Sequence, residues 1–386
     1  MNTPLGSKKT SFDHRIESLR GLAALAVVVT HSSAVLQVDH SPAFWQLSLL
    51  KQSLSQQLLT LLVAFFSSGA AVILFFVLSG YVLTLSVCRQ KSYESVRGLL
   101  SYAVRRLFRL IPPMWASIFL FWLVLEVVRT PENMSSFTLW FTSVFSVNLS
   151  AKDILENLFL IDFRANPVTW TMYTEVVGSA FIPASVALCT YWNRRISLWL
   201  LGGLALVTFF MYPRNPTGPL ELPLLGALYL VCFQAGLVLA LYREKNFLRA
   251  RFCLLAFPVF MFERLLAPAP HLSILLLTAG AALLLYGVTR GTLEKFLSHS
   301  PLRLLGKISY SLYLFHCPVL YLVGIVAASL GLANLKGLSP ALSIFMTAIP
   351  AAFLVAWGTY KSIEAPSIAC GRKISEWLMC RKGEAA

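Results

Sequence analysis

The chain has 386 residues, of which 57% are hydrophobic and only 13% are charged, and its mean hydropathy is +0.70. An ordinary soluble domain contains about 25% charged residues, so this composition excludes a soluble globular protein and predicts an all-α, polytopic integral membrane protein. The net charge of +15 does not indicate nucleic acid binding, because the cations of a membrane protein gather in loops on one side. The seven cysteines form no CxxC pair, and no histidine stands at metal-ligand spacing, so no metal site is predicted.

Ten apolar stretches predict a helical bundle of about ten transmembrane helices. Crossing a hydrocarbon core of about 30 Å takes roughly 20 residues. The stretches are residues 19–36, 61–87, 110–128, 169–191, 196–212, 220–241, 252–266, 271–288, 308–330 and 340–361. With ten crossings both termini lie on one side, where 25 of the 32 lysines and arginines fall, against seven on the other. The positive-inside rule then predicts that both termini are cytoplasmic.

The first stretch begins with Arg20 and contains His31. Eleven helical steps leave these side chains within about 20° of each other and about 16 Å apart along the axis. An ionisable residue inside a bilayer costs about 2.5–3.5 kcal/mol on insertion scales, which makes His31 a functional candidate. Imidazole can take a proton from a hydroxyl near neutral pH, so one interpretation is a general base. The alternative is a histidine that is satisfied by a neighbouring helix.

Polar and basic residues mark the next two stretches. Ser79 lies in the second, where a small residue typically lets helices approach closely. Arg105, Arg106 and Arg109 precede the third, either as ordinary positive-inside anchors or as a phosphate-binding cluster, because guanidinium forks bind phosphate oxygens. The adjacent pair at 112–113 is Pro-Pro, which suits the first turn of a helix and predicts a helix start near residue 110.

Residues 129–168 form the longest predicted external segment. Its apolar pieces, 137–147 and 154–161, are each too short to span a bilayer. They predict re-entrant or interfacial elements over an external cavity.

Trp170 and Glu175 open the fourth stretch, near the predicted external face. A carboxylate just inside a span needs a partner or a water-filled cavity. Glu175 could therefore orient an acceptor hydroxyl or pair with a cation such as Arg164.

The ninth stretch contains Tyr310, Tyr313 and His316, which follow one another at a spacing of three residues. That spacing places them along one side of a helix, and a polar stripe in lipid must face other helices. Glu364, near the end of the last stretch, could pair with a basic loop residue.

Taken in chain order, these features resemble the membrane acyltransferase 3 family, which includes bacterial O-antigen acetylases. The resemblance covers residues 12–366 and rests on six motifs. They are Arg20 and His31 at an arginine-x10-histidine spacing, FVLSGY at 76–81, Arg105-Arg106 with Arg109 and Pro112-Pro113, Trp170-Thr171-Met172 with Glu175, SYSLYLFH at 309–316 and IEAP at 363–366. Val176 stands where the family often has a second acidic residue. No hydrolase-like domain follows, so transfer is expected to finish within the membrane domain.

The resemblance implies that an acyl group, most often acetyl, moves from cytosolic acyl-CoA to a hydroxyl of a sugar or another acceptor. His31 would be the catalytic histidine and Arg20 its partner at the donor mouth, while Arg105, Arg106 and Arg109 would contact the donor phosphates. Glu175 is a further catalytic candidate. The expected substrate-binding residues are Ser79, Trp170, Tyr310, Tyr313 and His316. Acetyl-CoA or another acyl-CoA would be the donor, with no metal cofactor.

The predicted function is an O-acyltransferase of the bacterial inner membrane, with residues 1–366 as the acyltransferase domain and 367–386 as a cytoplasmic tail. Its partners would be the bilayer, acyl-CoA and a carbohydrate acceptor, lipid-linked or free, such as lipopolysaccharide O-antigen or exopolysaccharide. A transporter or flippase for an envelope precursor is the main alternative, because intramembrane His, Glu and Arg can also line a transport route. The two related halves typical of many transporters are not apparent. A non-catalytic receptor or assembly partner is a third possibility.

Overall fold

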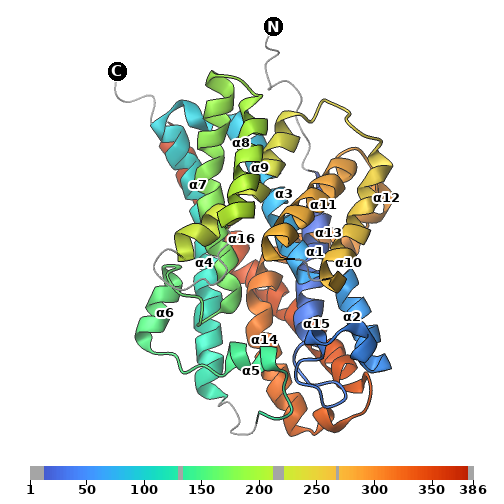
Figure 1. The fold of residues 1–386 in the computed structure, drawn as a ribbon. Helices are drawn as coiled ribbons and strands as arrows, with labels where there is room; N and C mark the ends of the chain where they lie inside the picture. Colours follow the sequence, from blue (N-terminus) through green and yellow to red (C-terminus); the bar gives the residue numbers. More distant parts are fainter. Residues whose placement is uncertain (1–12, 129–133, 212–220, 267–268, 381–386) are drawn as a thin grey trace.

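The computed structural model describes residues 13–128, 134–211, 221–266 and 269–380, and over these residues the chain is helical. Figure 1 shows the bundle, and its helices have the following bounds. They are α1 (His14–Ser33), α2 (Leu54–Phe65), α3 (Ser68–Gln90), α4 (Val96–Val127), α5 (Leu139–Phe145), α6 (Ala151–Leu158), α7 (Trp170–Tyr191), α8 (Ile196–Met211), α9 (Glu221–Leu241), α10 (Ala256–Leu266), α11 (Pro270–Val288), α12 (Glu294–Leu297), α13 (Ser300–Lys307), α14 (Ser309–Ser329), α15 (Ser339–Thr359) and α16 (Ala365–Cys380). The all-α prediction is confirmed.

Seven helical segments within the described residues are long and apolar enough to cross a membrane. They are Leu54–Gln90, Val96–Val127, Pro167–Tyr191, Pro223–Leu241, Pro270–Val288, Ser309–Ser329 and Ser339–Cys380. The other three predicted stretches are also helical, but α8 has only 16 residues, α10 has 11, and α1 begins with charged residues. The chain is therefore a multi-pass membrane protein, while the count of ten spans stays a prediction. Positions 212 and 220, at the ends of two predicted stretches, lie outside the described residues.

The second predicted stretch, 61–87, is not one helix. The chain breaks at Phe66, between α2 and α3. Ser67 caps α3, accepting a hydrogen bond from the backbone N–H of Ala70 at 3.2 Å. Thr30 of α1 donates to the carbonyl of Phe66 at 2.5 Å. Both polar partners satisfy backbone groups that a continuous helix would have bonded itself, which hydropathy alone does not reveal.

The helix start predicted near residue 110 is wrong, because α4 begins fourteen residues earlier, at Val96. Pro112 and Pro113 lie in its middle. Pro112 has no N–H to bond the carbonyl of Phe108, and Ser367 of α16 donates to that carbonyl instead, at 2.8 Å. A neighbouring helix thus satisfies the group that the proline leaves free, as is common in membrane proteins.

Helix α16 packs along the first half of α4. It continues from α15 through a π-helical turn at Tyr360–Glu364. Gly371 lies where an added Cβ would come within 2.5 Å of Phe108, and the hydroxyls of Ser101 and Ser375 are 2.7 Å apart. One helix therefore runs across the predicted boundary between 366 and 367. The last six residues lie outside the part of the chain that the structure describes.

The long predicted external segment contains two short helices, α5 and α6, of seven and eight residues, as its short apolar pieces predicted. Helix α5 covers the end of α1, where the N–H of Thr138 donates to the carbonyl of Val35 at 3.2 Å. Phe141 and Phe145 are fully buried and lie against Tyr321 of α14, and Figure 1 shows α5 beside α14. The segment is thus built into the bundle. Residues 129–133 lie outside the described residues.

Helices α3 and α9 approach each other at two glycines. A Cβ on Gly80 would lie 2.1 Å from the carbonyl oxygen of Phe233, and one on Gly236 would lie 2.1 Å from that of Val77. The obstacles are backbone atoms, which cannot rotate away. The motif around Ser79 and Gly80 does allow close helix packing, as predicted.

We expect Gly80→Ala to lower the free energy of unfolding by about 1–3 kcal/mol, because the added methyl group must push two helices apart. Gly203→Ala on α8 is the matched control, since no atom lies within 4 Å of the Cβ that it adds. Thermal unfolding of the two variants in detergent micelles measures the difference. Equal apparent Tm values for both variants would contradict the close packing of α3 and α9.

Candidate active site

The two intramembrane histidines meet although they are 285 residues apart. His31 lies near the end of α1 and His316 in α14, and His31 Nδ1 is 2.8 Å from His316 Nε2. His316 Nδ1 is 2.7 Å from the carbonyl oxygen of Tyr313. Helix α1 lies in the middle of the bundle, in contact with α3, α13, α14 and α15 (Figure 1). This packing brings the two rings together.

The hydrogen bonds assign the protons on both neutral rings. A carbonyl oxygen only accepts, so His316 carries its proton on Nδ1, and its Nε2 has a free lone pair. His31 Nδ1 must then donate its proton to His316 Nε2. The lone pair of His31 is left on Nε2. Tyr313, His316 and His31 therefore form a chain of hydrogen bonds that ends in a basic nitrogen.

His31 also lines a cavity of about 550 Å³. The ring of Trp140, on α5, stacks on the ring of His31 with centroids 4.8 Å apart. Trp170, Tyr229 and Tyr313 add further aromatic walls to this cavity. The His31 side chain is thus held beside a space that is large enough for part of a substrate.

A second, narrower pocket of about 40 Å³ holds the arginines. Arg20 of α1 and Arg106 and Arg109 of α4 line it, together with Glu175 and Tyr310. Val72 and Tyr313 line both spaces, so the narrow pocket adjoins the large cavity. The predicted pair on α1 is therefore divided, with Arg20 in the narrow pocket and His31 in the large cavity.

Glu175 is held on the arginine side of the site. Its Oε2 accepts from Arg106 Nη2 at 2.7 Å and its Oε1 accepts from the hydroxyl of Ser79 at 2.6 Å. Arg106 Nε also donates to the hydroxyl of Ser179 at 2.9 Å. The suggested pairing of Glu175 with Arg164 is wrong, because Arg164 lies on another segment and binds other carboxylates. Neutralisation by Arg106 lets the carboxylate remain buried.

Arg20 and Arg109 differ from Arg106 in their partners. Within the described residues, neither guanidinium makes a hydrogen bond or a close ion pair. Both interact electrostatically, at longer range, with the carboxylate of Glu364. Glu364 itself accepts from the hydroxyl of Ser311 at 2.6 Å, not from a basic loop residue as the sequence suggested. Two neighbouring guanidiniums with unused hydrogen-bond donors favour the binding of an anion such as a phosphate group.

Arg105 does not join the other arginines. Its guanidinium donates to the hydroxyls of Ser101 and Ser375 and to the amide oxygen of Gln90. These bonds connect α4 to α16 and to the end of α3. Arg105 therefore holds helices together rather than lining the pocket.

The predicted substrate-binding residues fall into three groups. Trp170 and Tyr313 line the large cavity, and the hydroxyl of Tyr313 accepts from Thr171 at 3.1 Å. Tyr310 lines the narrow pocket and donates to the carbonyl of Leu110 at 2.6 Å. Ser79 and His316 line neither space; they bind Glu175 and His31 respectively.

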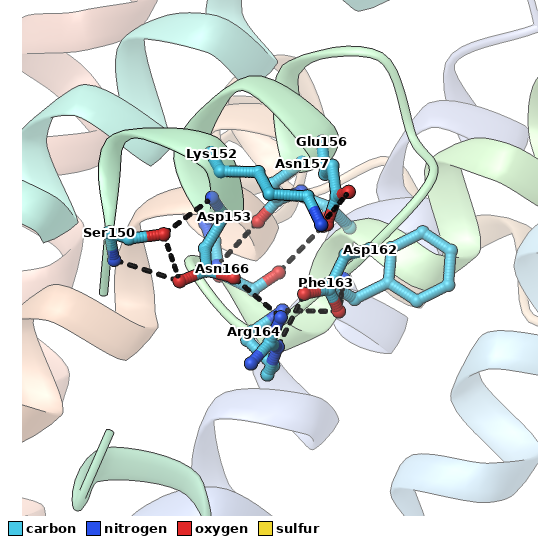
Figure 2. Close-up of polar contacts among 10 residues, drawn as sticks. Ser150, Lys152, Asp153, Glu156, Asn157, Asp162, Phe163, Arg164 and Asn166 are labelled. Carbon is cyan, nitrogen blue, oxygen red and sulfur yellow. Dashed lines mark hydrogen bonds and ion pairs between the residues drawn. The ribbon is translucent and has the colours of Figure 1, made fainter. Parts of the chain in front are cut away.

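Sequence reasoning missed the residues that fix the segment leading into the cavity. Figure 2 shows Arg164 paired with both Asp153 and Asp162. The backbone N–H of Asn166 donates to the side-chain oxygen of Asn157 at 2.8 Å, and the Asn166 amide donates to the Leu314 carbonyl at 3.2 Å. These contacts anchor the chain just before Pro167 and Val168, which line the cavity. Trp140 was also missed, although it lies in the apolar piece predicted to cover that cavity.

Asp153 gives this segment a pH dependence. Hydrogen bonds from the hydroxyl and N–H of Ser150, followed by the charge of Arg164, lower the pKa of the Asp153 carboxyl. A lowered pKa in the folded state stabilises the protein above the unfolded value, about 3.9, and this stabilisation is lost as the pH falls further. We therefore expect Asp153→Asn to lower the apparent Tm at pH 7, and the difference from wild type to close below about pH 4. Thermal unfolding across this pH range tests it; a difference that stays constant with pH would contradict the assignment.

One comparison with known proteins places the chain in a family. The family model described as an acyltransferase domain, that of the acyltransferase 3 family, matches residues 13–361. The match runs from α1 through α15 and so includes both histidines and all five arginines named above. No curated protein and no solved structure matches the chain.

Proposed function

We propose that this chain, which belongs to the acyltransferase 3 family, is an O-acyltransferase that moves an acetyl group from acetyl-CoA to a hydroxyl of a cell-envelope carbohydrate. Family membership makes it a membrane acyltransferase; the donor, acceptor and mechanism are our proposal. The observation that carries it is that His31 lines a cavity next to a pocket in which Arg20 and Arg109 have no hydrogen-bond or ion-pair partner among the described residues.

In the proposed reaction, His31 Nε2 takes the proton of the acceptor hydroxyl while the hydroxyl oxygen attacks the thioester carbonyl. The new C–O bond forms, the C–S bond breaks, and the CoA thiolate receives the proton from the imidazolium as free CoA leaves. His316 Nε2 accepts the hydrogen bond from His31 Nδ1–H throughout, so it fixes the tautomer and stabilises the positive ring. This is the role that an aspartate has in a Ser-His-Asp triad.

The arginines are proposed to hold the donor. Among the described residues, Arg20 and Arg109 have unused donors, which could bind the diphosphate and ribose phosphate of CoA. Arg106, paired with Glu175, shapes the pocket around them. Arg20 and His31 lie about 16 Å apart along α1, which an extended pantetheine arm can bridge. The arm would pass Val72 and Tyr313, whose side chains must part to admit it. By the positive-inside rule, this end of the bundle and both termini would face the cytosol of a bacterial inner membrane.

The acceptor is proposed to enter on the side of α5 and α6. Trp140, Trp170 and Tyr229 line the large cavity, and flat aromatic faces suit the apolar faces of sugar rings. A polysaccharide of the envelope, such as lipopolysaccharide O-antigen or exopolysaccharide, combines such rings with many hydroxyls. This chemistry supports a carbohydrate acceptor that is reached from outside the membrane.

Labelled acetyl-CoA tests the proposal. Purified protein is incubated with acetyl-CoA labelled in the acetyl group and with an envelope glycan extract. We expect label in the glycan fraction, bound as an ester that mild alkali releases. A transporter or flippase would move a precursor across proteoliposomes without forming this ester. Transport without ester formation by folded protein would overturn the acyltransferase proposal.

A further inference from the structure

We propose that His31, His316 and Cys317 form an inhibitory site for a thiophilic divalent cation, with Zn²⁺ as the test ion. Their ligand atoms all lie within 4.8 Å of one another. Imidazole nitrogen and thiolate sulfur are the ligands that Zn²⁺ favours in proteins. The spacing of these residues in the sequence predicted no such site, because it forms only when α1 packs against α14.

Two of the three ligand-to-ligand distances lie close to those of tetrahedral zinc, and the third is at most 4.8 Å. Zn–N bonds of about 2.0–2.1 Å and Zn–S bonds of about 2.3 Å place tetrahedral nitrogen and sulfur ligands about 3.6 Å apart. His316 Nε2 and Cys317 Sγ are 3.6 Å apart. Two nitrogen ligands should be about 3.3 Å apart, so the His31 and His316 rings, now 2.8 Å apart between their bonded nitrogens, must separate by about half an ångström.

Binding would remove the basic nitrogen on which the proposed reaction depends. His31 Nδ1 must give up its proton to bind the metal, and that proton moves to Nε2. The Cys317 thiol loses its proton to solvent and binds as the thiolate. The cation therefore replaces the hydrogen bond between the histidines and leaves His31 without a free lone pair.

The site is also accessible to an ion. His31 and Cys317 both line the cavity of about 550 Å³, which can supply a water molecule as the fourth ligand. Glu263 lines the same cavity and adds a carboxylate to the approach.

Cobalt tests the binding directly, because Co²⁺ adopts the same tetrahedral geometry and absorbs visible light. We expect Co²⁺ added to the purified full-length protein in micelles to give tetrahedral bands and a thiolate-to-cobalt charge-transfer band, both removed by Zn²⁺. Cys317→Ser should lose the charge-transfer band while circular dichroism shows an intact fold. Cys232→Ser is the matched control, since Cys232 is equally buried but bonds Thr278 at 3.2 Å, and it should keep the band.

Inhibition is the second readout and rests on the proposed function. Zn²⁺ should inhibit acetyl transfer by wild type, a chelator should restore it, and Cys317→Ser should be at least tenfold less sensitive. No charge-transfer band in wild type, or a band that persists in Cys317→Ser, would overturn the site. If Cys317→Ser does not fold, Cys317→Ala gives the same test. The cobalt spectrum does not depend on enzymatic activity. If the protein binds cobalt at this site but transfers no acetyl group, the proposed function is refuted while the metal site stands.

Discussion

Arg20→Gln and Arg109→Gln are each expected to raise the KM and Kd for acetyl-CoA by about tenfold to a hundredfold. A hydrogen bond to a charged group contributes about 1.5–3 kcal/mol, and these two guanidiniums have no protein partner to share it with among the described residues. Titration calorimetry with acetyl-CoA and initial-rate measurements give both constants. We expect kcat to change much less, because the reacting atoms lie at His31.

Two controls make this prediction specific. S-Acetylpantetheine lacks the diphosphate, so the arginine variants should use it as well as wild type does. Arg105→Gln should leave the donor KM unchanged, because Arg105 binds Ser101, Ser375 and Gln90 outside the pocket. The same loss with S-acetylpantetheine, or an equal loss in Arg105→Gln, would show that these arginines act on the fold rather than on the donor phosphates.

His31→Ala is expected to lower kcat by about 10²–10⁴-fold, the usual contribution of a general base, with little change in the Kd for acetyl-CoA. His31 does not line the adjoining arginine pocket, so binding of the donor phosphates should survive. Initial-rate assays of product formation give kcat, and calorimetry on the same preparation gives the Kd for acetyl-CoA. Near-normal transfer by folded His31→Ala would refute the base assignment.

His316 acts through His31 and provides an internal comparison. His316→Ala should lower kcat less than His31→Ala, because the base remains although its tautomer and its charged form lose support. It should also shift the pH profile of kcat, which a purely structural residue would not do. The double variant should be no slower than His31→Ala alone, since the two rings work as one unit.

Much of the fold could be predicted from hydropathy, because backbone groups in lipid must be bonded within a helix. Helices α7, α9, α11 and α14 end within two residues of their predicted positions. Hydropathy failed at α4, whose basic first half packs against α16. The helix start predicted from Pro112 and Pro113 was wrong for a related reason. A neighbouring helix can replace the hydrogen bond that a proline removes, and here Ser367 donates to the carbonyl of Phe108.

The candidate site was predictable only where one helix carries it. Arg20 and His31 could be related through the geometry of α1 alone. The contact between His31 and His316 depends on how two distant helices pack, and the same holds for Trp140 and Cys317. Glu175 shows the limit most clearly: its need for a cation was predictable, but its choice of Arg106 over Arg164 follows from the position of α4 beside α7.

The most direct test of the account is the release of free CoA from acetyl-CoA by the purified protein with a crude envelope glycan extract, with wild type and His31→Ala measured side by side. We expect release that requires both the extract and His31, and that equals the amount of ester formed on the glycan. Absence of release by folded wild-type protein with every extract tried, or release that His31→Ala supports equally well, would contradict acyl transfer by His31.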